Sequence, residues 1–467
     1  MTGRHYSPRS VTIVVIELTW ILFSLAMVLY LDILQQHTDL RFHQLTQQVG
    51  FAMLLYLAGF YYADLYNFTG LRLHRELVTV AVRAFSVLAV IFGAVYLCTH
   101  WLTFPSGWMF VHLLVTIAFI VAVRTRIDGV LTRFGMVTKI AIVGIGTEAR
   151  RLGEEILRRR EYGHEVCCFV GTHVNTAETL RVRTPNPGVR AIPVIGADGL
   201  LEFARQNRIK RILVATADVG DALPVDDLLR CKTEGYEVED GHTFYERLLG
   251  RIFTAGLSPQ WLIFSDGFVR PGRVRAVKRV IDVIAATCLL LFTVPLCALV
   301  ALAIKLEDGG PVLFRQSRTG RRGAHFDLHK FRSMQVDAEA ETGPKWAEND
   351  DPRVTRVGRW IRLLRIDEIP QTWNVLRGEM SFVGPRPERP EFVANLQRVI
   401  PYYDQRHAVL PGITGWAQVN YPYGATIQDA RHKLEYDLYY LKNFSVLMDA
   451  FIMLRTIKII LFGWGSR

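Results

Sequence analysis

Four long apolar segments occupy most of the first 135 residues, and they limit what this part of the chain can fold into. They cover residues 11–31, 49–66, 78–98 and 108–123. Hydrocarbon offers no partner for backbone hydrogen bonds, so segments of about 20 apolar residues that enter it form helices. The first segment is too long for a signal-peptide core, and no small-residue cleavage site is evident. Residues 1–135 are therefore predicted to form a transmembrane four-helix block.

Arginines between these segments predict its orientation, because cytoplasmic loops collect lysine and arginine. The connection after the first segment has only Arg41, and the one after the third has neither residue type. The connections after the second and fourth contain Arg72, Arg75, Arg124, Arg126 and Arg133. Both ends of the block are therefore predicted to be cytoplasmic. Glu17 lies within the first segment, and both a polar helix-packing contact and a functional role stay open for it.

Composition limits the partners. The net charge of +11 suits an anionic partner, such as a membrane surface or a nucleotide phosphate. Nucleic acid is the least favoured, because long apolar segments dominate both ends of the chain, and none is predicted as a partner. The six cysteines show no metal-ligand spacing and three lie in apolar segments, which indicates reduced thiols without a disulfide framework.

Residues 136–266 have the pattern of a Rossmann-like α/β domain. An apolar strand at 139–143 runs into a glycine turn containing Gly144 and Gly146, and further short strands are predicted at 166–170 and 211–215. No acidic residue closes the second strand, as a dinucleotide fingerprint requires. Two roles therefore remain for this domain. A packing or regulatory role is favoured, and binding of a nucleotide at Gly144 and Gly146 is the alternative.

A second kind of apolar segment follows at about 279–305. It is long enough to span a bilayer, yet positive charges flank both of its ends, which favours both ends on the cytoplasmic side. Pro295 near its middle removes a backbone hydrogen bond and predicts a bend or break. A re-entrant helix-break-helix and a kinked transmembrane helix both fit these residues.

Two adjacent carboxylates, Asp367 and Glu368, lie between two predicted helices. The first is amphipathic and covers residues 359–365, with arginines three apart; the second begins near Pro370 and stops near Gly378. A helix start and nearby arginines favour an ionised carboxylate, so Asp367 is predicted to be a competent nucleophile near bound phosphate. The simpler alternative is that both residues only cap the helix and pair with arginines.

Five motifs surround this pair in a fixed order: 330–334 (KFRSM), 351–358 (DPRVTRVG), 366–370 (IDEIP), 378–387 (GEMSFVGPRP) and 411–420 (PGITGWAQVN). Together they resemble the bacterial sugar transferases that act on polyprenyl phosphate, the monotopic phosphoglycosyl transferases, over residues 273 to 440. The resemblance implies an α-rich catalytic domain at 267–467 with a re-entrant helix broken at Pro295. Larger members of this family place four membrane helices and an α/β domain ahead of it.

The resemblance also implies a reaction at the cytoplasmic face of the bacterial inner membrane. Asp367 would attack a UDP-sugar, release UMP and form a phosphosugar-aspartyl intermediate. Undecaprenyl phosphate would then take the phosphosugar from Asp367, which begins an exopolysaccharide or capsule repeat unit. UDP-glucose or UDP-galactose is the expected donor. Mg²⁺ would be held by Asp367 and Glu368, and substrate phosphate would be bound by Arg362, Arg386, Lys330 and Arg332. A homodimer stays open.

Two other classes of function need weighing. A membrane-bound nucleotide-sugar dehydratase or epimerase would need a complete dinucleotide fingerprint and a Tyr-x-x-x-Lys pair in the α/β part. Tyr162 is followed four residues later by Val166 instead of lysine. A non-catalytic scaffold for polysaccharide assembly is the remaining alternative, and a transfer assay on the purified protein distinguishes it from an enzyme.

Overall fold

The structure is a computed structural model. It describes residues 8–36, 42–66, 74–99, 106–133, 137–159, 163–171, 179–184, 188–215, 223–254, 257, 259–268, 272–336, 351–422, 424 and 426–462. The chain divides into two compact units, the first ending at Gly241 and the second beginning at His242.

Four helices cover the four apolar segments at the start of the first unit: α1 (Pro8–Gln36), α2 (Phe42–Tyr62), α3 (His74–Thr99) and α4 (Ser106–Arg133). Ile21, Tyr56 and Leu88 are fully buried where these helices pack together. By length and hydropathy, α1 and α3 could each cross a membrane, as could the later helix α10 (Gly272–Asp308), among the described residues. The transmembrane role of all four segments stays a prediction.

Glu17 has a partner within this group of helices. Its carboxylate is fully buried and accepts hydrogen bonds from Arg124, at 2.7 Å from Nε and 3.0 Å from the second terminal nitrogen. Nearby, His112 bridges the Tyr56 hydroxyl at 2.7 Å and the Ser24 hydroxyl at 2.9 Å. Of the two interpretations of Glu17, the structure favours a polar contact that joins α1 to α4.

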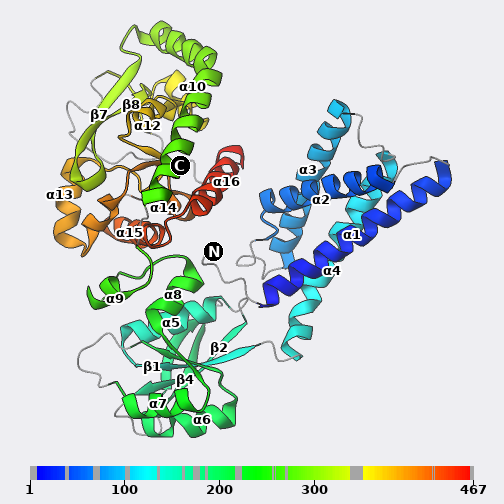
Figure 1. The fold of residues 1–467 in the computed structure, drawn as a ribbon, viewed down its shortest axis with the longest axis vertical. Helices are drawn as coiled ribbons and strands as arrows, with labels where there is room; N and C mark the ends of the chain where they lie inside the picture. The colour runs from blue at the N-terminus through cyan, green and yellow to red at the C-terminus, as the bar shows by residue number, and fades with distance from the viewer. Residues whose placement is uncertain are drawn as a thin grey trace. The chain divides into compact units, whose positions relative to one another are not determined.

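An α/β domain follows in the middle of the chain, as the sequence predicted, and its sheet has six strands among the described residues. Its strands are β1 (Thr138–Val143), β2 (His164–Gly171), β3 (Thr179–Thr184), β4 (Gly188–Gly196), β5 (Arg211–Val214) and β6 (Glu237–Asp240), in the order β3-β4-β2-β1-β5-β6. All neighbours pair in parallel except β3, which is antiparallel to β4. The connecting helices are α5 (Thr147–Arg158), α6 (Leu200–Asn207) and α7 (Val225–Thr233), shown in Figure 1. The parallel order is Rossmann-like.

The second unit is mainly helical, with two small sheets. β7 (Leu313–Thr319) and β8 (His325–Phe331) form an antiparallel hairpin, and β9 (Ser381–Val383) pairs in parallel with β10 (Gly412–Thr414). Besides α10, its helices are α8 (Gly241–Leu249), α9 (Pro259–Phe264), α11 (Arg356–Leu363), α12 (Gln371–Arg377), α13 (Pro390–Val399), α14 (Trp416–Asn420), α15 (Ile427–Lys442) and α16 (Val446–Phe462). Val375, Met380, Leu434 and Leu438 lie fully buried in its core.

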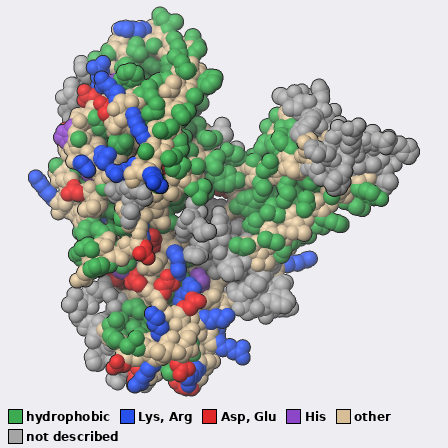
Figure 2. All heavy atoms as spheres, viewed as in Figure 1, with side chains coloured by type: hydrophobic (Ala, Val, Ile, Leu, Met, Phe, Trp, Pro, Cys, Tyr) green, Lys and Arg blue, Asp and Glu red, His purple; other side chains and the backbone are tan. Residues whose placement is uncertain are grey.

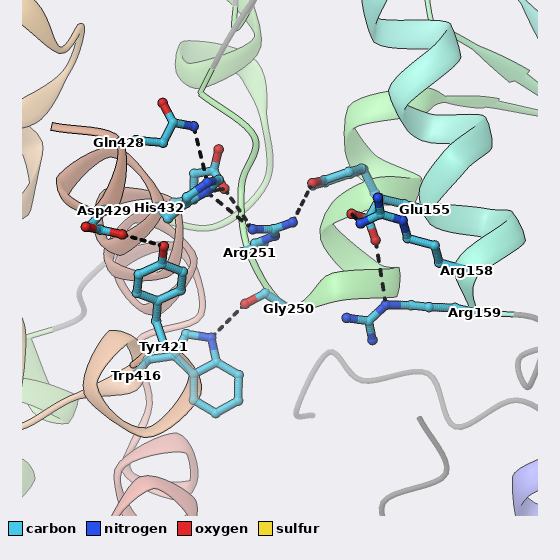
Figure 3. Close-up of polar contacts among 12 residues, drawn as sticks. Glu155, Arg158, Arg159, Gly250, Arg251, Trp416, Tyr421, Gln428, Asp429 and His432 are labelled. Carbon is cyan, nitrogen blue, oxygen red and sulfur yellow. Dashed lines mark hydrogen bonds and ion pairs between the residues drawn. The ribbon is translucent and has the colours of Figure 1, made fainter. Parts of the chain in front are cut away.

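Described residues within 242–266 pack against the rest of the second unit, although the sequence analysis grouped them with the α/β domain. The buried indole of Trp416 donates a 2.7 Å hydrogen bond to the Gly250 carbonyl, and Arg251 reaches His432 at 3.5 Å (Figure 3). Glu246 pairs with Lys442 at 2.6 Å. Such contacts join residues about 170 to 200 apart along the chain, which local sequence patterns do not register.

α10 continues through Pro295, so of the bend or break predicted there the helix does not break. The helix is continuous over 37 residues with Pro295 inside it, and Figure 1 shows that it changes direction before the chain reaches β7. Arg279 near one end donates to the Val375 carbonyl, while Glu307 near the other accepts the Arg356 backbone N–H at 2.7 Å. Both ends therefore contact the same unit, whereas a straight helix of this length would extend about 55 Å.

Candidate active site

Asp367 and Glu368 lie in a single helical turn between two helices, as their sequence context predicted. α11 ends at Leu363, and Arg365 then adopts the left-handed conformation with φ 58°, which reverses the chain. A turn of 3₁₀ helix covers Ile366–Glu368, and α12 begins immediately after Pro370. Gly378 ends α12 at φ 82°, a value that glycine adopts without strain.

Asp367 is buried and one of its oxygens has no hydrogen-bond partner among the described residues. Asp367 is 8% exposed, and the oxygen without a partner is Oδ1. Burial raises the pKa of this carboxyl above its ordinary value, although Lys330 and Arg365 oppose the shift. The arginines favour the ionised form of Asp367, as the sequence predicted, but desolvation outweighs this positive charge in its effect on the pKa.

Glu368 has the opposite electrostatic balance. Its Oε1 lies 3.4 Å from Lys330 Nζ and 3.5 Å from a terminal nitrogen of each of Arg365 and Arg386. Burial alone would raise the pKa of Glu368, but these cations lower it to about 2. Glu368 therefore remains ionised at neutral pH and gathers three cationic groups beside Asp367.

The predicted phosphate-binding residues separate into two groups. Lys330, at the end of β8, and Arg386, after β9, both reach the carboxylate pair through Glu368. Arg362 on α11 is one of the positive charges that oppose the rise in the pKa of Asp367 caused by burial. Arg332 is buried and instead forms an ion pair with the exposed Asp308 at the end of α10, which gives it a structural contact away from Glu368.

Asn374 is a residue that the sequence analysis did not single out. It is fully buried on α12; its Oδ1 accepts the His329 backbone N–H at 3.1 Å, and its Nδ2 donates to the Asp327 carbonyl at 2.7 Å. These bonds fasten α12 to β8 and thereby hold the carboxylate pair against Lys330. Its signal in the sequence was a polar residue between Trp373 and Leu376 in an apolar stripe, which is weak by itself.

The turn that carries Arg386 is fixed on both sides. The Gly384 N–H donates to the Thr414 carbonyl at 2.9 Å, and the Gly412 N–H donates to the Pro385 carbonyl at 2.9 Å. A side chain at Gly384 would collide with the Leu410 carbonyl oxygen, 2.3 Å from the position of its Cβ. Two of the five sequence motifs therefore fold together as one support for Arg386.

Comparisons with known proteins identify this arrangement. A family model described as bacterial sugar transferase matches residues 273–463. An undecaprenyl-phosphate glucose phosphotransferase of Komagataeibacter xylinus is 34% identical over 415 residues, covering 82% of this chain and 71% of that protein. The chain belongs to the bacterial sugar transferase family.

Other relatives of this sugar transferase differ in the sugar that their names specify. A UDP-glucose:undecaprenyl-phosphate glucose-1-phosphate transferase of Xanthomonas campestris pv. campestris is 30% identical over 367 residues, covering 75% of this chain and 73% of that protein. An Aeromonas hydrophila protein named as a UDP-N-acetylgalactosamine-undecaprenyl-phosphate N-acetylgalactosaminephosphotransferase is 44% identical over 241 residues. The alignment covers 51% of this chain and 56% of that protein. The family match contains all five motifs and the carboxylate pair.

A second family model, described as a CoA-binding domain, matches residues 61–217, a range that includes α3, α4 and the strands β1 to β5. Gly144 has φ +121°, and a Cβ there would lie 2.5 Å from the Ala215 carbonyl oxygen. Gly146 precedes α5 with an ordinary φ of −68°. The close approach of the ends of β1 and β5 accounts for Gly144 without a ligand, and nucleotide binding there stays a prediction.

The fit of a magnesium ion depends mainly on Asp367. The described residues contain no group of three or more histidine, cysteine, aspartate or glutamate side chains that could hold a metal ion. The buried Asp367 Oδ1 suits a cation, whereas Glu368 Oε1 already faces three positive groups that would repel one. Mg²⁺ often binds through one carboxylate plus substrate phosphates, so the residues fit a site completed by substrate.

Proposed function

We propose that this protein transfers a hexose-1-phosphate from a UDP-sugar to undecaprenyl phosphate through a covalent intermediate on Asp367. The observation that carries the proposal is the buried Asp367 Oδ1, without a hydrogen-bond partner among the described residues, beside the cations gathered by Glu368. The names of the relatives support the acceptor and the class of reaction. Glucose is the donor sugar we favour, since two relatives that align with 75% or more of this chain are named for it.

The reaction proceeds by two displacements at one phosphorus atom. One oxygen of the Asp367 carboxylate attacks the β-phosphorus of the UDP-sugar, the bond to the bridging oxygen breaks, and UMP leaves with the electron pair. An oxygen of undecaprenyl phosphate then attacks the same phosphorus, and the Asp367 carboxylate is released. Lys330 and Arg386 stabilise the negative charge that develops on the phosphoryl oxygens, because they are fixed before the substrate binds.

The membrane arrangement follows from α10. Leu291, Phe292 and Leu299 on either side of Pro295 are 69%, 84% and 65% exposed, and Figure 2 shows hydrophobic side chains over much of this helix. A surface of this kind suits lipid better than water. Since both ends of α10 contact the same unit, we propose that it dips into the inner membrane from the cytoplasmic side and returns, bringing the lipid acceptor to Asp367.

The test of this function uses purified protein in nanodiscs with undecaprenyl phosphate. UDP-glucose, UDP-galactose and UDP-N-acetylgalactosamine are supplied separately, and UMP and lipid-linked sugar are measured. We expect both products in equal amounts with one donor strongly preferred. A protein that releases no UMP with any of these donors, although it is folded, would favour the scaffold alternative.

Magnesium is expected to be required. When bound, Mg²⁺ would neutralise diphosphate charge beside Asp367. EDTA should abolish transfer and added Mg²⁺ should restore it. Independently of activity, Mn²⁺ bound in the presence of UDP-sugar, measured by electron paramagnetic resonance, should weaken in Asp367→Asn. Full transfer in excess EDTA would refute the requirement.

The pH dependence of transfer is expected to report the ionisation of Asp367. Attack requires the carboxylate, so kcat/KM should fall as pH decreases through the raised pKa of Asp367. Arg362→Gln removes a cation that lowers this pKa and should move the acid limb to higher pH. Arg359→Gln, on an exposed position of the same helix, is the matched control and should leave it in place. An unchanged acid limb in Arg362→Gln would contradict the assignment.

A further inference from the structure

Arg406 lies outside the carboxylate site but is bonded to the turn that carries Arg386. It lies in a short 3₁₀ segment, Tyr403–Ala408, and is 4% exposed. Its Nε donates to Asp437 Oδ2 at 3.0 Å, one terminal nitrogen donates to the Tyr403 hydroxyl at 2.6 Å, and the other donates to the Arg386 carbonyl at 3.1 Å. Its planar guanidinium thus connects three separate segments.

Asp437 provides the fixed end of this connection. It lies on α15, is 1% exposed, and approaches a second guanidinium nitrogen of Arg406 at 2.9 Å. Burial raises the pKa of Asp437 to about 6, although Arg406 opposes this shift. Of the more distant charges, Glu388 raises this pKa and Lys433 lowers it. The carboxylate is therefore mainly ionised at neutral pH, and the buried pair resists separation because each charge would lose its partner.

The backbone around Arg386 is held at three successive carbonyls. The Pro385 carbonyl accepts from the Gly412 N–H at 2.9 Å, and the Pro387 carbonyl accepts from Arg318 at 3.2 Å. Arg406 holds the carbonyl between them, that of Arg386 itself. Because proline has no N–H, the turn contributes few donors of its own, and its position depends on these external donors.

We propose that Arg406, anchored by Asp437, is a positioning residue that fixes the backbone of Arg386 so that its guanidinium meets Glu368 and the phosphate of the substrate. The inference deepens the proposed transfer reaction and rests on it. Arg406 touches neither carboxylate of the site in the described contacts, so it acts through Arg386. A displacement of about 1 Å at such a group can lower turnover about a hundredfold.

The decisive experiment is a double-mutant cycle in the full-length protein. Arg406→Lys keeps a charge beside Asp437, but its single nitrogen cannot span the partners that three guanidinium nitrogens reach. We expect kcat to fall about tenfold to a hundredfold with a smaller change in KM. In an Arg386→Ala background the same change should cause little further loss, because the residue it positions is gone. Equal losses in both backgrounds would show a general structural role and overturn the proposal.

Two further measurements distinguish a positioning role of Arg406 from a general role in stability, and one of them does not depend on the proposed function. Tyr403→Phe removes one partner of Arg406 but neither the Asp437 nor the Arg386 contact. It should therefore lower Tm while leaving kcat close to the wild-type value. A kcat loss equal to that of Arg406→Lys would overturn the proposal. Hydrogen exchange should accelerate in the peptide containing residues 384–388 of Arg406→Lys, and unchanged exchange would also overturn it. If the wild-type protein transfers no sugar phosphate, the proposed function fails, while the exchange measurement still tests the connection.

Discussion

Asp367→Asn should reduce sugar-phosphate transfer by at least about a thousandfold while the protein remains folded. Asparagine nearly matches aspartate in shape but cannot form an acyl phosphate, so the substitution removes the nucleophile alone. Burial already disfavours the charged form of this carboxyl, so a neutral amide there should cause little loss of stability. UMP release, lipid product and Tm measured on the same nanodisc preparation check both parts of the prediction.

The covalent intermediate gives a direct observation of the same residue. Wild-type protein mixed with UDP-sugar in the absence of lipid acceptor should carry a hexose phosphate on the peptide that contains Asp367, as seen by mass spectrometry. Asp404→Asn, the same chemical change at an exposed position, is the control and should transfer and be labelled normally. Normal turnover by Asp367→Asn, or labelling of a different residue, would rule out the assignment.

The second large effect concerns where the catalytic unit begins. A fragment of residues 242–467 should keep transfer activity, whereas a fragment of residues 267–467 should fold poorly and lose it. The shorter fragment lacks Ile252 and Leu257, which are 1% and 6% exposed, and the Gly250 carbonyl bonded to Trp416. Two buried side chains and one hydrogen bond together represent about 5 kcal/mol. That is comparable with the whole stability of many domains, about 5–15 kcal/mol.

Thermal unfolding and transfer at equal amounts of folded protein compare the two fragments. Trp416→Phe in the full-length protein serves as a control, since it removes the N–H donor while keeping most of the aromatic packing. It should lower stability by about 1 kcal/mol, a small part of the fragment effect. A 267–467 fragment as stable and active as the longer one would show that residues 242–266 contribute nothing essential.

Local features of the chain were predictable because they depend on neighbours in sequence. The apolar segments, the parallel strands around Gly144 and the helices on either side of the carboxylate pair all appear in the fold close to their expected bounds. Period, turn residues and helix signals act over a few residues, so a single sequence contains them. The five ordered motifs likewise indicate the family, because their residues and spacing lie along the chain itself.

The state and surroundings of the site were decided only by tertiary structure. Burial raises the pKa of Asp367 despite the nearby arginines, and this burial depends on packing that the arginines along the sequence do not report. Arg332 pairs with Asp308, while Lys330, two residues earlier, reaches Glu368. The sequence by itself indicated the candidate groups for the chemistry. Contacts between distant segments determined which of them meet and how strongly each is charged, since desolvation and hydrogen bonding depend on distance in space.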